Sequence, residues 1–163
     1  MIRRLLVWYT ERGHLLHALA IVVYLGLIFA LSSMKFEPVL HIDFLETLLF
    51  NFCHVPLYFG LSIPLALYGR KIFGIEAGGP IRWNWILFTA LILIVYAISD
   101  EYHQSFTGRE PAVSDLVNDA IGGCGGILTI SYLLDGQPGR KDFWLSCASL
   151  VGAALLVIIT SIG

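Results

Sequence analysis

Five long runs of apolar residues limit what this chain can fold into more than any other feature of the sequence. The hydrocarbon core of a bilayer is about 30 Å thick, and an α-helix needs roughly 20 residues to cross it. We therefore predict an all-α, polytopic membrane bundle with about five transmembrane helices, which forms a single domain over residues 1–163. The predicted spans are His14–Leu31, Leu45–Tyr68, Trp83–Ser99, Ser114–Leu134 and Phe143–Ile162.

The composition excludes an ordinary soluble domain and a nucleic-acid-binding protein. Charged residues make up 13% of the chain and hydrophobic residues 57%, whereas soluble domains carry roughly 25% charged residues. A net charge of −2 supplies no basic field for nucleic acid. The cysteines lie in apolar runs without metal-ligand spacing, so we expect them to pack as small residues. Membrane lipids are the expected partners, and no motif specifies an oligomer.

The distribution of Lys and Arg predicts the orientation of the bundle. With five spans, two basic residues, Lys35 and Arg109, fall on one side of the membrane. The other side carries Arg3, Arg4, Arg12, Arg70, Lys71, Arg82, Arg140 and Lys141. Because basic residues favour the cytoplasmic side, we predict a multi-pass plasma-membrane protein with a cytoplasmic N-terminus and an external C-terminus.

Polar residues gather where the fourth predicted span begins. Asp115, Asn118, Asp119, Gly122 and Gly126 share one helical face. Gly122 and Gly126 form a GxxxG pair, which allows another helix backbone to approach closely, so this face should point into the bundle. Ser114 as an N-cap and Asp115 as a first-turn acid also have a purely structural explanation. Asn118 and Asp119 lie a full turn further in, where burial in a membrane is costly.

The end of the third predicted span supplies a second set of polar groups. Glu101 and Gln104 share a face if the helix continues for one more turn, and His103 lies between them in the sequence. Arg109 follows in the connecting loop, where it would either close the loop through a salt bridge or hold an anionic group of a ligand. Both roles remain open at this stage. On the predicted orientation, these residues lie on the extracytoplasmic side.

His54 is an ionisable residue deep inside the second predicted span, a position that indicates a functional site by default. Asn51 and Tyr58, at i−3 and i+4, extend a polar stripe along the same face. The alternative is a neutral imidazole that only bonds a neighbouring helix. His54, Glu101, His103 and Asp115 could offer metal ligands, but no HExxH-like spacing supports this. We therefore predict no metal and no cofactor.

The pattern of these residues resembles the VanZ-like family of small membrane proteins. The resemblance covers about residues 16–134 and is carried by Ser32, Ser33, Pro38, His54, Tyr58, Glu101, Gln104, Phe106, Arg109, Ser114, Asp115, Asn118, Gly122 and Gly126. The family often has a Lys three residues before the His, where this chain has Asn51. The resemblance implies a role in the cell envelope, because the name-giving member is associated with low-level resistance to teicoplanin, a lipid-bearing glycopeptide.

Three functions follow as hypotheses. In the first, the protein is an intramembrane enzyme for an envelope lipid or lipid-linked precursor, with His54, Glu101 and Asp115 as acid–base groups. Its substrate would contact Arg109, Gln104, Asn118, Tyr58, Asn51 and His103. In the second, the same site binds a lipid headgroup or lipopeptide without catalysis. In the third, the polar cluster only ties the helices together.

Overall fold

Helices make up most of the chain that the structure describes. A computed structural model describes residues 1–34, 43–79, 83–107 and 112–135, apart from the side chains of residues 43–52. This part of the chain contains α-helices and no strand, so the all-α prediction is confirmed for it. The helices are α1 (Ile2–Thr10), α2 (His14–Ser32), α3 (Asp43–Ile72), α4 (Trp83–Thr107) and α5 (Val113–Asp135). The predicted span Phe143–Ile162 lies outside the described residues.

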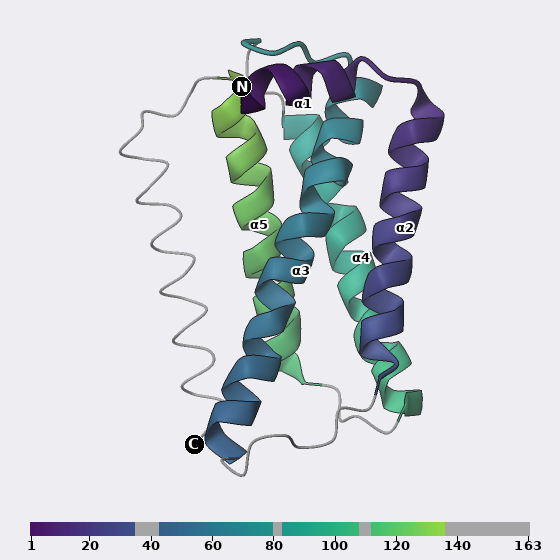
Figure 1. The fold of residues 1–163 in the computed structure, drawn as a ribbon, viewed down its shortest axis with the longest axis vertical. Coiled ribbons are helices and arrows are strands. Elements are labelled where there is room, and N and C mark those ends of the chain that lie inside the picture. Colours follow the sequence, from purple (N-terminus) through teal and green to yellow (C-terminus); the bar gives the residue numbers. More distant parts are fainter. Residues whose placement is uncertain (35–42, 80–82, 108–111, 136–163) are drawn as a thin grey trace.

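The four long helices, α2 to α5, run along the length of the bundle, and the short helix α1 crosses one end of it (Figure 1). Successive long helices alternate in direction, so the last turns of α2 and α4 and the first turns of α3 and α5 gather at the end opposite α1 (Figure 1). This alternation matters for the site. It brings the first half of α3, the last turns of α4 and the first turns of α5, which are distant in the sequence, to the same end of the bundle.

Three of the four long helices are of the membrane-spanning type. By length and composition, three of the described helices could cross a membrane: α2, α4 and α5. Large apolar side chains such as Val22 on α2 and Leu91 on α4 point outward and are exposed, which suits a surface that faces lipid rather than water. The protein is therefore a helical membrane protein. The number of five spans and the positions of the termini across the membrane stay predictions.

Helix α3 lies at the centre of the bundle, and its apolar face is almost completely buried. Leu61, Leu65 and Ala66 are each at most 1% exposed. The helix runs without interruption through Pro56 and Pro64. Each proline removes one backbone hydrogen bond, and tertiary packing must outweigh that cost. The helix begins two residues before, and ends four residues after, the apolar run Leu45–Tyr68 that the sequence predicts.

The interface between α3 and α5 depends on Gly122 and Gly126, because neither residue has a side chain that would keep the two helices apart. A Cβ at Gly122 would collide with the backbone carbonyl of Val55, and a Cβ at Gly126 would collide with Ser62 and with the carbonyl of Phe59 at 2.8 Å. The predicted role of the GxxxG pair is confirmed, and its partner is α3. This close approach fixes the position of α5 along the axis of α3, and therefore which residues in the polar first turns of α5 face His54.

Candidate functional site

His54 is the centre of a buried cluster of ionisable side chains between α3 and α5. Its imidazole Nδ1 lies 2.9 Å from Oδ1 of Asp119, and its Nε2 lies 3.6 Å from Oδ2 of Asp115. All three residues are at most 7% exposed. Because an ionised carboxylate can only accept a hydrogen bond, the neutral imidazole places its proton on Nδ1, and Nε2 remains available as a base.

The spacing of α5 explains why two acids meet one histidine. Asp115 and Asp119 are one helical turn apart and therefore project from the same face. Asn118 is completely buried beside them. The prediction that this face points into the bundle is confirmed. Ser114 lies inside the first turn of α5 rather than at its N-cap, because the helix begins at Val113.

Glu101 reaches the cluster from α4, which continues to Thr107 and so extends two turns past the predicted Ser99. Its Oε2 accepts a hydrogen bond from the backbone N–H of Ala112 at 2.9 Å, at the start of α5. Its Oε1 is buried and has no hydrogen-bond partner among the described residues. One ligand atom each from His54, Glu101 and Asp119 lie within 4.8 Å of one another. Glu101 therefore joins α4 to the site on α3 and α5.

A cavity of about 270 Å³ lies beside His54, between α2, α3 and α4. Its walls are mainly apolar, and His54, Asp100 and Gln104 add polar groups to them. Gln104 Nε2 donates to Asp100 Oδ2 at 3.1 Å, and both side chains are buried. The complete lining consists of Ile28, Leu31, Ser32, Cys53, His54, Pro56, Leu57, Tyr58, Asp100 and Gln104. An apolar chamber with a few polar groups is the usual form of a small-molecule or lipid site.

Four more residues of the predicted site remain to be placed: Tyr58, His103, Arg109 and Asn51. Tyr58 is 1% exposed and lines the cavity, as its position in the predicted stripe requires. His103 instead faces α2, where its Nε2 lies 2.9 Å from the Ser33 hydroxyl and its ring lies against Phe29. Arg109 and the side chain of Asn51 lie outside the described residues.

The sequence interpretation left Asp119 and Asp100 out of the predicted site. Asp119 makes the shortest contact with His54, and its i+4 relation to Asp115 was a signal that could have identified it. Asp100 shares a helical face with His103 and Gln104 by its spacing, but it was not included in the predicted site, because a carboxylate at the end of an apolar run is also common at a membrane surface. Only the position of α2 and α3 around it makes Asp100 part of the cavity.

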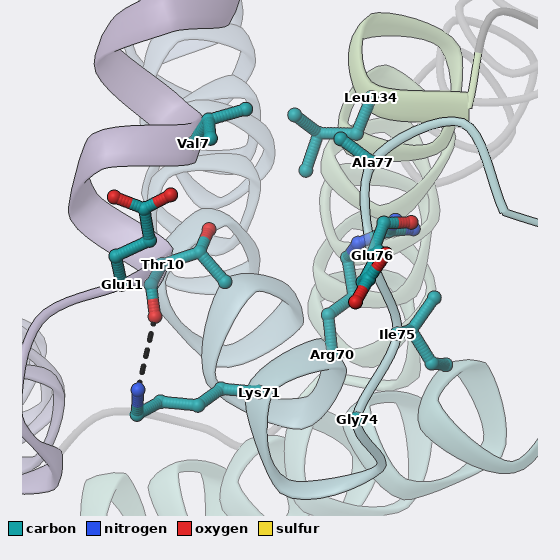
Figure 2. A pocket seen from close by; sticks show the side chains of 10 residues that line it. All are labelled: Val7, Thr10, Glu11, Arg70, Lys71, Gly74, Ile75, Glu76, Ala77 and Leu134. Carbon is teal, nitrogen blue, oxygen red and sulfur yellow. Dashed lines mark hydrogen bonds between the residues drawn. The ribbon is translucent and has the colours of Figure 1, made fainter.

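A second, more polar cavity, of about 510 Å³, lies at the opposite end of the bundle beneath α1. Figure 2 shows its walls, in which Lys71 reaches toward α1 and donates to the backbone carbonyl of Thr10 at 3.1 Å. Arg70 forms a bidentate ion pair with Asp135, with N–O distances of 2.7 and 2.8 Å, and it also donates to the carbonyl of Glu76 at 3.0 Å. These contacts pair both terminal nitrogens of the Arg70 guanidinium with protein oxygens, while its buried Nε has no hydrogen-bond partner among the described residues. The ion pair and the Lys71 contact make this cavity a structural junction of α1, α3 and α5.

Taken together, the fold and the site define a class: a small helical membrane protein with a buried histidine–carboxylate cluster at one end of its bundle. Within this class, the chain belongs to the VanZ/LLP1 family, whose family model matches residues 7–134. The matched segment contains every residue of the His54 cluster: His54, Glu101, Asp115 and Asp119. No curated protein and no solved structure matches the chain.

Proposed function

We propose that this VanZ-like protein acts on the headgroup of an envelope lipid, or of a lipid-linked precursor, at the extracytoplasmic face of the plasma membrane. The observation that carries the proposal is the position of His54, held by Asp119 at 2.9 Å and faced by Asp115 at 3.6 Å beside an apolar cavity. A carboxylate that fixes the tautomer of an imidazole prepares its second nitrogen for proton transfer. The positive-inside distribution of basic residues supports the external placement.

In this function, His54 is the general base and Asp119 is its positioning residue. Asp115 lies next to Nε2, where it can exchange a proton with the imidazole or with a bound hydroxyl group. The apolar walls of the cavity receive part of the lipid chain, while Gln104 and Tyr58 offer polar contacts to the headgroup. Altered processing of an envelope lipid would change the response of the cell to teicoplanin, a lipid-bearing glycopeptide.

A non-catalytic binder of a lipid headgroup or lipopeptide is the second candidate, favoured by the predominantly apolar lining of the cavity. A purely structural role for the cluster has less support. Groups that only tie helices together are normally paired when buried. Here Glu101 Oε1 and Asp119 Oδ2 are buried without a hydrogen-bond partner among the described residues.

Three substitutions in a teicoplanin-sensitive host test the proposed function: His54→Gln, Asp119→Asn and Glu101→Gln. We expect each to abolish the change in minimum inhibitory concentration that the wild-type chain confers, at an equal level of folded protein in detergent size-exclusion chromatography. His103→Gln is the matched control and should retain the effect, because His103 faces α2. If Glu101→Gln retains full activity, the binder is favoured over the enzyme. If all three variants retain it, the proposed site is wrong.

A further inference from the structure

We propose that His54, Glu101 and Asp119 bind one divalent transition-metal cation, with Asp115 as an adjacent oxygen donor. One ligand atom from each of the three residues lies within 4.8 Å of the other two. Imidazole nitrogens and carboxylate oxygens bind such ions at about 2.0–2.2 Å, so donors on one ion lie at most about 4.4 Å apart. The trio is therefore close to a chelating arrangement, although its spacing in the sequence, from three different helices, matches no metal motif.

The unpaired oxygens of the trio are the second observation that points to a cation. Glu101 Oε1 and Asp119 Oδ2 are buried and have no hydrogen-bond partner among the described residues, and the two residues are 5% and 0% exposed. Leaving a buried acceptor unsatisfied costs about 1–3 kcal/mol, and more if it is charged. A cation bound by these oxygens would remove that cost.

The negative charge of the cluster also favours a divalent cation as its ligand. With a neutral imidazole, the two carboxylates of the trio carry a formal charge of −2 and the adjacent Asp115 adds −1, so one divalent cation balances two of the three negative charges. In the described part of the chain, no Lys or Arg forms an ion pair with Glu101, Asp115 or Asp119. Buried charges in proteins are normally paired or coordinated to a metal. The described walls of this site therefore attract a cation and repel an anion.

The donor set indicates which ion the site would prefer. One imidazole and two or three carboxylates suit Zn²⁺ or Mn²⁺ better than Ca²⁺ or Mg²⁺, which prefer oxygen ligands alone. Three protein ligands leave at least one coordination position free, as in catalytic rather than structural zinc sites. For its role, this inference rests on the proposed site of the proposed function: in the metal-bound protein the His54 imidazole would be a ligand instead of the free base, and the ion would give an anionic headgroup a positive partner beside the cavity. Binding of the ion itself is measurable without any activity.

Metal binding to the purified full chain, with its affinity tag removed, tests the inference. The protein in nanodiscs is stripped with EDTA, and binding of Zn²⁺ and of Mn²⁺ is then measured by calorimetry and by elemental analysis after desalting. We expect about one bound ion per chain. Loss of residues that only support a metal ligand weakens binding 10- to 100-fold, so His54→Gln, Glu101→Gln and Asp119→Asn should each weaken it by more than about 100-fold. His103→Gln, which replaces a histidine outside the trio, should bind as the wild type does.

Substitution with Co²⁺ provides a readout that does not depend on the folding of any variant. Co²⁺ in a nitrogen–oxygen site should give visible absorption bands in the wild type that excess Zn²⁺ displaces. Absence of both stoichiometric binding and these bands in folded wild-type protein would overturn the inference, and so would unchanged affinity in folded trio variants. If the wild type binds no ion but the His54 variant still loses its teicoplanin phenotype, the metal site fails and the proposed function stands. If the ion binds and the phenotype does not depend on His54, the proposed function fails and the metal site stands.

Discussion

Removal of one partner from the Arg70–Asp135 ion pair gives the sharpest stability prediction for this fold. The two side chains are 1% and 2% exposed, and both guanidinium–carboxylate contacts are shorter than 3 Å. The pair joins the last turn of α3 to the last residue of α5. Asp135→Leu leaves a buried guanidinium without its counter-charge, which typically costs about 3–5 kcal/mol. We expect a loss of this size in the free energy of unfolding.

The double variant Arg70→Met/Asp135→Leu should recover most of that loss, because apolar side chains of similar volume often replace a buried pair without net cost. Free energies of unfolding are measured by SDS titration of the protein in mixed micelles, with the helical signal in circular dichroism as the readout. Glu76→Gln is the control, since its side chain is exposed and only its backbone carbonyl contacts Arg70. It should change stability by less than about 0.5 kcal/mol. The reasoning is refuted if Asp135→Leu costs less than about 1 kcal/mol, or if the double variant is less stable than either single variant.

Two further predictions concern the contacts between helices. Gly122→Val should separate α3 from α5 and cost about 3 kcal/mol or more in the same unfolding assay, because its side chain would overlap the Val55 carbonyl. Gly26→Val, at a helical glycine with open space around it, should be tolerated, and equal losses in both variants would contradict this account of the interface. Tyr96→Phe removes the 2.7 Å hydrogen bond from its hydroxyl to the carbonyl of Leu25, which links α4 to α2, and should cost about 0.5–1.5 kcal/mol. Tyr102→Phe, at an exposed position on the same helix, should have no measurable effect on the unfolding midpoint.

The predicted spans agree with the observed helices where the local sequence determines where a helix begins and ends. His14–Leu31 corresponds to α2 and Ser114–Leu134 to α5, each within one residue at either end. The third prediction ended at Ser99, where polar residues begin, but α4 continues to Thr107. Its added turns carry Asp100, Glu101 and Gln104, which are buried by neighbouring helices. Hydropathy could not predict that extension, because the stabilising contacts come from distant parts of the chain.

The sequence predicted which residues belong to the candidate site better than it predicted which of them contact each other. The sequence placed His54, Glu101 and Asp115 in one cluster, and the structure brings all three to the same region. The closest partner of His54 is nevertheless Asp119, while His103 turns to Ser33 on α2. A difference of one helical turn separates Asp115 from Asp119, and the relative height of two packed helices determines which of them meets the imidazole.

The sequence by itself determined the helical class, the apolar outer surfaces and the face of α5 that carries its acids and glycines. These follow from side-chain chemistry and from the 3.6-residue period, both of which are local properties. Only the tertiary structure decided that Arg70, which the sequence predicts to lie beside a cytoplasmic loop, is buried against Asp135, and that Glu101 holds the start of α5. Such pairings depend on how closely the helices approach and at what height. That geometry is set by contacts such as Gly122 against Val55, between residues 67 positions apart in the chain.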